Sequence, residues 1–428
     1  MRKVIVSAGI IILLIVVASA CASTRVPVNA APRTIFVPED YSTIQEAIAF
    51  ASDGDVVSVK NGVYLVDENT TIVINKTLTL IGEDPKNTVI LGASPKRYEN
   101  GIAIRLAAPN STISGFTIAN FGVAVSIANY YAEPYPSGCK IVNNNILNNS
   151  EGIRPQRNDL LISGNNITNN NSGITGYNTE NIMINRNNIT ENGYGTYIGI
   201  CKNITISENQ ISNNTGGINL YYYGPHFVSC NNVTNNGWGI RFAEACSNAT
   251  VYDNNITQKG IGVALLNFPN AGDIVVSGVG NIVYGNLFIN NAKQVTQQES
   301  NYNYPSTTRM GTDIVSWDNG AIGNYWTDYS GLDDNDDGIG DEPYFINEDN
   351  KDNYPFMTPE RSLSPTPQPS PSSSPKPTPT LEPTPTMEPV AEQAPFSTTL
   401  IISFLVVAAV VGLCLLVYLK KHGRNKNP

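Results

Sequence analysis

The sequence predicts an all-β fold, a right-handed parallel β-helix of about 22 residues per coil, and three features support this prediction. The first is a phrase of the form apolar-x-x-Asn-x-apolar that begins at Ile141 and occurs seven times, with steps of 21, 22, 22, 22, 23 and 32 residues. A fixed repeat of this length indicates stacked structural units. The second is that each repeat contains three short apolar segments divided by Asn and Gly, which are too short for helices.

The third feature is a column of asparagines. Each phrase carries Asn two residues before its last apolar residue, at Asn144, Asn165, Asn187, Asn209, Asn231, Asn254 and Asn286. Identical amides on neighbouring coils can hydrogen-bond to one another along a stack, as they do in cross-β structures. We therefore expect these residues to form a structural ladder.

Each coil is expected to have three sides, with its apolar residues turned inward. The inward positions are both ends of the phrase and a third position seven residues later, which follows a Gly and is filled by Ile153, Ile174, Ile218, Ile240 and Val263. Asn and Gly between the segments accept left-handed backbone angles and therefore mark the corners. Coils stacked about 4.8 Å apart would pair as parallel strands.

Upstream of the repeats, short β-branched segments predict strands at residues 34–37, 56–59, 71–74, 78–81 and 89–91. The stretch Ser42-Thr43-Ile44-Gln45 predicts a capping box that starts a short helix through Ala51. The β-helix would occupy residues 34–292, and a C-terminal cap would occupy residues 293–357.

The two ends of the chain predict export and anchoring. Met1-Arg2-Lys3 and the apolar run that follows indicate a signal peptide over residues 1–20, with lipidation of Cys21 as an alternative. Pro, Thr and Ser dominate residues 358–395, which indicates an extended stalk. Residues 396–419 predict a transmembrane helix, and the basic residues after them predict that the tail, residues 420–428, is cytoplasmic. We therefore expect a single-pass cell-membrane protein with an extracellular ectodomain.

Composition limits the partners. The chain carries 26 Lys plus Arg against 36 Asp plus Glu, a formal net charge of −10, and it has no patterned basic stretch that would bind nucleic acid. Cys139, Cys201, Cys230 and Cys246 show no metal-site spacing. Cys201 and Cys246 share a coil position two coils apart, about 10 Å, which is too far for a disulfide. We interpret the four mainly as buried thiols, and other pairings stay open.

Aromatic residues supply the candidate ligand site. Tyr194 and Trp238 hold the same coil position two coils apart, and Tyr197 and Tyr222 lie along the neighbouring side. Aromatic rings on a rigid face can stack on sugar rings, so glycans or envelope polymers are the expected partners. The alternative is that these rings only pack between coils.

An enzymatic role is the weaker hypothesis. Hydrolases need paired carboxylates, and lyases need a neutralised uronate and a base. The coils offer Arg154, Arg241 and Glu244 as candidate catalytic residues, but no column of Asp accompanies them. A solvated polar face explains these residues better, so we expect binding before catalysis.

One motif predicts a metal site. Residues 333–341 read DDNDDGIGD and match the start of a calcium loop, with oxygen ligands expected from Asp333, Asn335, Asp337, Ile339 and Asp341. Position twelve is Tyr344 where an EF-hand has Glu, which leaves the last ligand open between Glu342 and Asp349. We expect a structural Ca²⁺ in the C-terminal cap, with an acidic solvated turn as the alternative.

Several stretches carry a family resemblance. YSTIQEAIAFASDGDVVSVKNGVY and INKTLTLIGE resemble the N-terminal cap of pectin-lyase-like β-helix proteins, in which an amphipathic helix closes the apolar end of the coil. The repeats, together with WDNGAIGNYWTDYSGLDDNDDGIGDEPYFINEDNKDNYPFM, are similar to the NosD-type and CASH-domain β-helix families. The resemblance covers residues 34–357 and implies the coil, not an activity, because these families share the coil and differ in function.

The NosD name implies copper, and the residues argue against it. Copper sites take His, Cys or Met. His422 falls in the predicted cytoplasmic tail, and His226 falls in a column where Leu160, Ile182 and Ile204 would point inward. We interpret His226 as a core or corner residue, so a NosD-like copper-accessory role is disfavoured.

Twelve Asn-x-Ser/Thr sequons could carry glycans on an exported chain, although several follow automatically from the repeated Asn-Ile-Thr. They are Asn69, Asn75, Asn110, Asn148, Asn166, Asn170, Asn188, Asn203, Asn213, Asn232, Asn248 and Asn255. The sequence therefore predicts a membrane-anchored, cell-surface β-helix with a carbohydrate-binding, adhesion or envelope-structural role. A polysaccharide-modifying lyase, hydrolase or epimerase is the alternative, and a spacer without a ligand is a third possibility.

Overall fold

The structure is a computed structural model that describes residues 31–67, 70–93, 101–128, 135–267, 278–299 and 315–360. The predicted signal peptide, transmembrane helix and tail, and nearly all of the predicted stalk, lie outside these residues. In the part that is described, no helix has the length and apolar character needed to cross a membrane.

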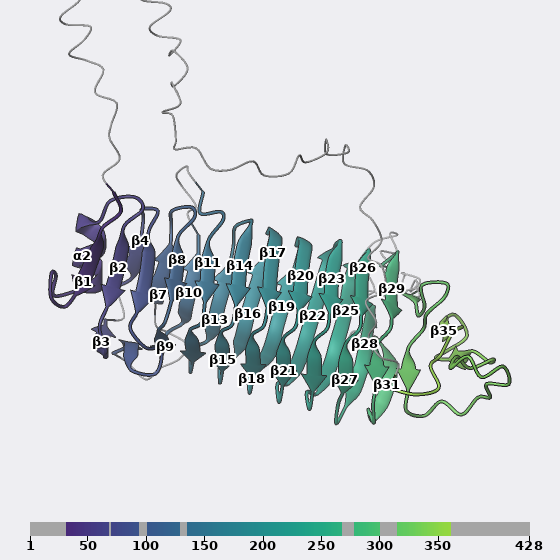
Figure 1. The fold of residues 1–428 in the computed structure, drawn as a ribbon. Helices are drawn as coiled ribbons and strands as arrows, with labels where there is room; N and C mark the ends of the chain where they lie inside the picture. The colour runs from purple at the N-terminus through teal and green to yellow at the C-terminus, as the bar shows by residue number, and fades with distance from the viewer. Residues whose placement is uncertain are drawn as a thin grey trace, which may run out of the picture. The chain divides into compact units, whose positions relative to one another are not determined.

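The described residues form a parallel β-solenoid of the right-handed type, built from three long sheets (Figure 1). The twelve-stranded sheet contains β1 Thr34–Val37, β2 Val56–Val59, β5 Thr79–Gly82, β8 Thr112–Ser114, β11 Lys140–Val142, β14 Leu160–Ser163, β17 Glu180–Asn185, β20 Lys202–Ser207, β23 His226–Ser229, β26 Ala249–Tyr252, β29 Asn281–Tyr284 and β32 Val315–Ser316. The eleven-stranded sheet contains β3 Gly62–Val66, β6 Thr88–Gly92, β9 Thr117–Ala119, β12 Asn145–Leu147, β15 Asn166–Thr168, β18 Asn188–Thr190, β21 Gln210–Ser212, β24 Asn232–Thr234, β27 Asn255–Thr257, β30 Leu287–Phe288 and β33 Tyr325–Trp326. The ten-stranded sheet contains β4 Ile72–Ile74, β7 Ile102–Leu106, β10 Val123–Ile127, β13 Glu151–Pro155, β16 Ser172–Tyr177, β19 Tyr194–Gly199, β22 Gly216–Tyr223, β25 Trp238–Cys246, β28 Ile261–Asn267 and β31 Lys293–Glu299.

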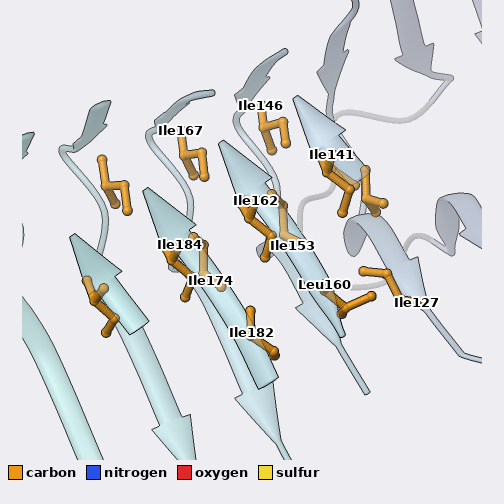
Figure 2. Packing of buried hydrophobic residues seen from close by; sticks show 14 of the residues in the cluster. Ile127, Ile141, Ile146, Ile153, Leu160, Ile162, Ile167, Ile174, Ile182 and Ile184 are labelled. Atoms are coloured by element: carbon orange, nitrogen blue, oxygen red, sulfur yellow. The ribbon is translucent and has the colours of Figure 1, made fainter. Parts of the chain in front are cut away.

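Equivalent residues lie side by side because the register repeats from coil to coil. Ile162, Ile184 and Ile206 are register partners in β14, β17 and β20, and side chains of this kind fill the core (Figure 2). The predicted third inward position is buried at Ile153, Ile174, Ile218, Ile240 and Val263. One coil places Thr196 in this column, and its buried hydroxyl has no hydrogen-bond partner. The predicted parallel coil is therefore confirmed.

The seven predicted asparagines form one continuous ladder inside the solenoid. Each side-chain Nδ2 donates to the Oδ1 of the Asn in the next coil at 2.9–3.1 Å. The backbone N–H of each Asn donates to the same oxygen. The ladder extends to Asn324, whose backbone and side-chain N–H groups donate to the buried Asp352 carboxylate at 2.6 and 3.2 Å. The ladder therefore ends at a carboxylate, which accepts hydrogen bonds and donates none.

A second ladder, which the sequence analysis did not predict, lies three residues after each phrase. It contains Asn149, Asn170, Asn192, Asn214, Asn236 and Gln258. It continues through Asn291 and Gln294 to Asp328, where Gln294 Nε2 donates to the carboxylate at 3.0 Å. Asn170, one of the twelve sequons, is buried here with its amide nitrogen engaged, so the folded coil has no room for a glycan at this position.

Helix α2, Ile44–Phe50, covers the N-terminal end of the core with three buried residues, Ile44, Ala47 and Ile48. Its N-cap is Thr43, whose Oγ1 accepts the Glu46 N–H at 3.1 Å. The prediction of a capping box starting at Ser42 is therefore wrong by one residue, and the Ser42 hydroxyl donates to the Glu46 carboxylate at 2.7 Å. Strand β3 was not predicted, because this edge strand exposes Val63 and Leu65.

The C-terminal cap surrounds a short antiparallel pair, β34 Tyr344–Phe345 and β35 Lys351–Asp352. Trp317 and Trp326 are fully buried in it. The Trp326 ring stacks on Phe288 at 4.2 Å and on Tyr344 at 4.4 Å. These rings cover the other end of the apolar core.

The cysteine prediction is only partly correct. Cys139, Cys201 and Cys246 are buried free thiols. Cys230 is a free thiol but is exposed, because it occupies a corner of the coil where the backbone is left-handed, with φ 54°. Arg186 and Glu208 occupy the same corner in earlier coils with φ 55° and 56°, so this corner accepts residues other than Asn and Gly.

His226 is a core residue. It is fully buried, its register partners are Ile204 and Ala249, and neither ring nitrogen has a hydrogen-bond partner. Burial lowers the pKa of His226 to about 4, since the surrounding apolar groups disfavour the charged ring.

Replacing a ladder amide will destabilise the coil. Asn209→Ala removes an oxygen that accepts two N–H groups of Asn187 and a nitrogen that donates to the Ile184 carbonyl. We expect a loss of roughly 2–4 kcal/mol, because several buried polar groups lose their partners. Thermal unfolding followed by circular dichroism measures this. Asn188→Ala, on the exposed face, is the control, and equal midpoints for the two variants would contradict a stabilising ladder.

Because of His226, the free energy of unfolding will decrease as the pH falls. The pKa of His226 in the folded protein lies below its ordinary value of 6.5, so the unfolded chain binds the proton more readily. The stabilising effect of the neutral ring is complete above about pH 6.5 and is lost as pH falls through about 4, by up to about 3 kcal/mol. His226→Leu, which copies Leu160 in the same column, should show a smaller drop in melting temperature between pH 7 and pH 4. An unchanged drop would contradict this assignment.

Candidate functional site

An aromatic cluster lies on the outer face of the ten-stranded sheet, on the neighbouring strands β19, β22 and β25. We define it as Tyr194, Tyr197, Tyr221 and Trp238. The ring centroids of Tyr194 and Trp238 are 6.0 Å apart, and those of Tyr197 and Tyr221 are stacked at 4.7 Å. Tyr194 and Tyr197 meet edge to face at 6.3 Å, which joins the two pairs into one cluster.

Gly216 makes this arrangement possible. Strand β22 lies between β19 and β25, and Gly216 is the register partner of both Tyr194 and Trp238. A Cβ atom at Gly216 would lie 2.4 Å from Trp238 Cζ2, closer than two carbons can approach. The indole therefore fills the space of the missing side chain and reaches Tyr194 across the intervening strand.

Asn219 holds the indole in place. Trp238 Nε1 donates to Asn219 Oδ1 at 3.3 Å, and Asn219 Nδ2 donates to the Thr196 carbonyl at 3.2 Å. Asn219 is the register partner of Tyr197 and Arg241 on the outer face, yet it is fully buried. A buried polar group with both ends hydrogen-bonded fixes the side chains around it.

Arg241 completes the cluster. Its guanidinium carbon lies 3.9 Å from the centroid of the Trp238 ring, and Nη1 donates to the Tyr221 hydroxyl at 3.4 Å. Its Nε is shielded from solvent and has no hydrogen-bond partner. The cation is thus oriented by an aromatic face.

The chemistry offered by the cluster is mixed. The stacked Tyr197 and Tyr221 rings cover one face of each other, so this pair presents edges and hydroxyl groups to solvent. Tyr194 is more open, with 37% of its surface exposed. Ring edges, hydroxyls and a guanidinium on rigid strands suit a polar ligand with apolar faces, which combines stacking with hydrogen bonds.

Tyr222 lies outside the cluster, although it was predicted to belong to the ligand site. Its backbone is left-handed, with φ 51°, and its ring packs against Tyr223 at 6.3 Å. Tyr221 occupies the cluster in its place. Tyr221 lies on the same face of β22 as Asn219, two residues before it, because side chains alternate along a strand. The register with β25 shifts only after Tyr221, where β25 has one extra residue.

The candidate catalytic residues do not share one site. Arg154 is on β13 and is held by the Glu151 carboxylate through two hydrogen bonds of 2.7 and 2.5 Å. Arg241 is on β25, and three strands of the sheet lie between β13 and β25. Glu244 also belongs to β25, but its side chain is outside the described part of the chain.

The predicted calcium ligands are occupied by backbone groups of their own loop. Asp333 accepts the N–H groups of Asp337 and Gly338 at 3.1 and 2.9 Å, and Asp341 accepts the Asp334 N–H at 2.7 Å. The remaining side-chain ligands behave similarly, with Asn335 accepting from Asp337 N–H and Asp337 from Ile339 N–H. The Tyr344 hydroxyl, at position twelve, donates to Asp328. Each of these loop oxygens keeps a lone pair that could still bind a cation.

No three His, Cys, Asp or Glu side chains of the described ranges converge in an arrangement that could hold a metal ion. The candidate soft donors are separated. His226 is sealed in the core, and Cys139, Cys201 and Cys246 are buried on other coils. Burial raises the pKa of the Cys201 thiol to about 11, which disfavours the thiolate that a metal requires.

Comparison with solved structures finds proteins of low sequence identity. The Dettilon tailspike protein aligns with a TM-score of 0.42 and 14% identity, over 62% of this chain and 68% of its own. A mannuronan C-5 epimerase A-module from Azotobacter vinelandii aligns with a TM-score of 0.38 and 14% identity, over 64% and 94%. A mannuronic acid specific family 6 polysaccharide lyase from human gut microbiota aligns with a TM-score of 0.37 and 11% identity, over 63% and 83%. No curated protein sequence matches this chain.

One sequence family matches most of the solenoid. Its description is periplasmic copper-binding protein (NosD), and it matches residues 40–209 and 109–331. Copper would require accessible His, Cys or Met donors in one place, and the described donors do not fit this requirement. The matched segments together span more than half of the 428 residues, and the chain therefore belongs to the NosD family.

Proposed function

We propose that this protein binds glycans at the cell surface and that the aromatic cluster is the binding surface. The observation that carries the proposal is the contact between Trp238 and Tyr194 across Gly216, with Arg241 at the same place. Sugars have apolar faces and polar rims, and proteins recognise them with aromatic rings and a few hydrogen-bonding groups. Asn192, Asn214 and Asn236, which are rungs of the second ladder, come two residues before β19, β22 and β25 and hold the starts of these strands together.

The predicted flanking segments support a surface location. An exported chain with a stalk over residues 358–395 and a helix over residues 396–419 would hold the solenoid away from the outer side of the membrane. A glycan-binding or adhesive role makes use of such an arrangement. A soluble protein would instead require that residues 396–419 do not insert.

Binding is better supported than catalysis. A glycoside hydrolase needs two carboxyl groups flanking the scissile bond. The described side chains that contact the aromatic cluster are aromatic, amide and guanidinium groups, and Arg154 already has Glu151 as its partner. We therefore propose recognition without bond cleavage.

We also propose that Ca²⁺ binds the loop at residues 333–341. The support is the spacing of Asp333, Asn335, Asp337 and Asp341 with a left-handed Gly338 at position six, φ 82°. The cap carries the acceptors of both ladders, so an ion in its loop would stabilise the end of the solenoid.

Trp238→Ala will abolish glycan binding. The purified full-length chain in detergent is applied to a glycan array with the wild type in parallel. We expect at least about a tenfold loss of signal on every glycan that the wild type binds, because the main stacking group is removed. Phe227→Ala is the control, since Phe227 is an exposed aromatic residue on the twelve-stranded sheet, outside the aromatic cluster. Retained binding by Trp238→Ala would refute the proposed surface.

Calcium will raise the melting temperature of the cap. We expect the transition to shift upward by a few degrees in millimolar Ca²⁺ relative to EDTA, because a ligand of the folded state stabilises it. Differential scanning calorimetry measures the shift, and Asp333→Asn with Asp337→Asn should remove it. An identical transition in Ca²⁺ and EDTA would leave the acidic solvated turn as the correct interpretation.

A further inference from the structure

Arg241 differs from Arg33, Arg154 and Arg186, which each pair with a carboxylate. Arg33 pairs with Asp55 at 3.0 Å, Arg154 with Glu151 at 2.5 Å and Arg186 with Glu208 at 2.8 Å. The contacts of Arg241 are the face of Trp238 and a long hydrogen bond to Tyr221. Its positive charge is therefore not neutralised by a described side chain.

The stacking prepares this cation for a ligand. A guanidinium held against an indole loses part of its rotational freedom and part of its hydration before any ligand arrives. Its planar N–H groups match the geometry of carboxylate and sulfate oxygens better than the geometry of a neutral hydroxyl. The shielded Nε, which lacks an acceptor, makes an added negative charge more favourable still.

The charge distribution permits an anionic ligand at this face in spite of the net charge of −10. Residues 315–360 contain twelve Asp and Glu and a single Lys, which gives this segment a charge of −11. Residues 31–299 contain 15 Lys and Arg against 20 Asp and Glu, a sum of −5 spread over a much longer segment. Negative charge is therefore densest in the C-terminal cap, which follows β31, the second strand after β25 in the ten-stranded sheet.

We propose that Arg241 selects glycans that carry an anionic group, a carboxylate or a sulfate, and that the anion binds the guanidinium while the adjoining sugar contacts Tyr194 and Trp238. This inference rests on the proposed function, because it names the ligand class of the same surface. Arg241 is the specificity-determining residue, and Trp238 supplies affinity for the sugar itself.

The test compares matched charged and neutral polymers. The full-length chain is titrated with polygalacturonate and with its fully methyl-esterified form, and separately with dextran sulfate and with dextran. The wild type should bind at least one charged polymer about tenfold or more tightly than its neutral counterpart. Arg241→Gln should remove this preference, so that the charged polymer binds no more tightly than its neutral counterpart. Arg241→Lys keeps the positive charge but lacks the planar guanidinium group. This variant should retain only part of the preference for the charged polymer.

The controls separate failure of this inference from failure of the proposed function. Arg154→Gln should keep the preference, since Arg154 is already occupied by Glu151. Equal binding to charged and neutral polymers, or a preference that survives Arg241→Gln, would overturn the inference and leave glycan binding intact. Absence of binding to all four polymers, or binding that Trp238→Ala does not reduce, would overturn both. The pair that shows the preference identifies the anion as carboxylate or sulfate.

Discussion

The structure depends on the two amide ladders. A chain that turns a corner inside a stack of coils carries backbone N–H groups that cannot reach a strand partner, and buried donors of this kind must be satisfied. In each repeat the Asn Oδ1 accepts a backbone N–H and a side-chain N–H of the preceding coil, as Asn165 does for Asn144. An apolar residue at this position would leave several groups unpaired in a medium of low dielectric. The same amide therefore returns in every coil while the surface residues beside it vary.

The periodic part of the fold could be predicted from the sequence because its cause is periodic. The coil, the inward Ile columns and the first ladder all follow from residues at fixed spacing, as with Ile162 and Asn165. The second ladder has the same spacing, with Gln258 in place of Asn, but it was hidden among the many surface asparagines of the repeats. Local departures could not be predicted. The exposure of Cys230 depends on a left-handed corner, and strand β3 lacks the alternation of a buried strand.

Only part of the candidate site could be predicted from the sequence, for a similar reason. The repeat count aligned Tyr194 with Trp238, since both hold the same position in their coils. It could not reveal that Gly216 leaves the space in which the indole lies, or that Asn219 and Arg241 fix that indole, because these are contacts between coils at different positions. Tyr221 belongs to the cluster in the regular register, and the register with β25 shifts only after it. Sites on a solenoid arise where one coil departs from its neighbours, and such departures carry no periodic signal.

The head-to-tail direction of the ladders has a consequence for how such a protein changes in length. Every interior rung offers an oxygen to the coil before it and a nitrogen to the coil after it, so a duplicated coil fits between any two existing ones with all its amides paired. Only the last position of each ladder is different. There the carboxylates of Asp352 and Asp328 accept N–H groups but have no N–H group to donate to a further coil. Growth or loss of whole coils in the middle would therefore move a surface of the solenoid nearer to or farther from the C-terminal cap, in steps of about 4.8 Å, without redesign of either end.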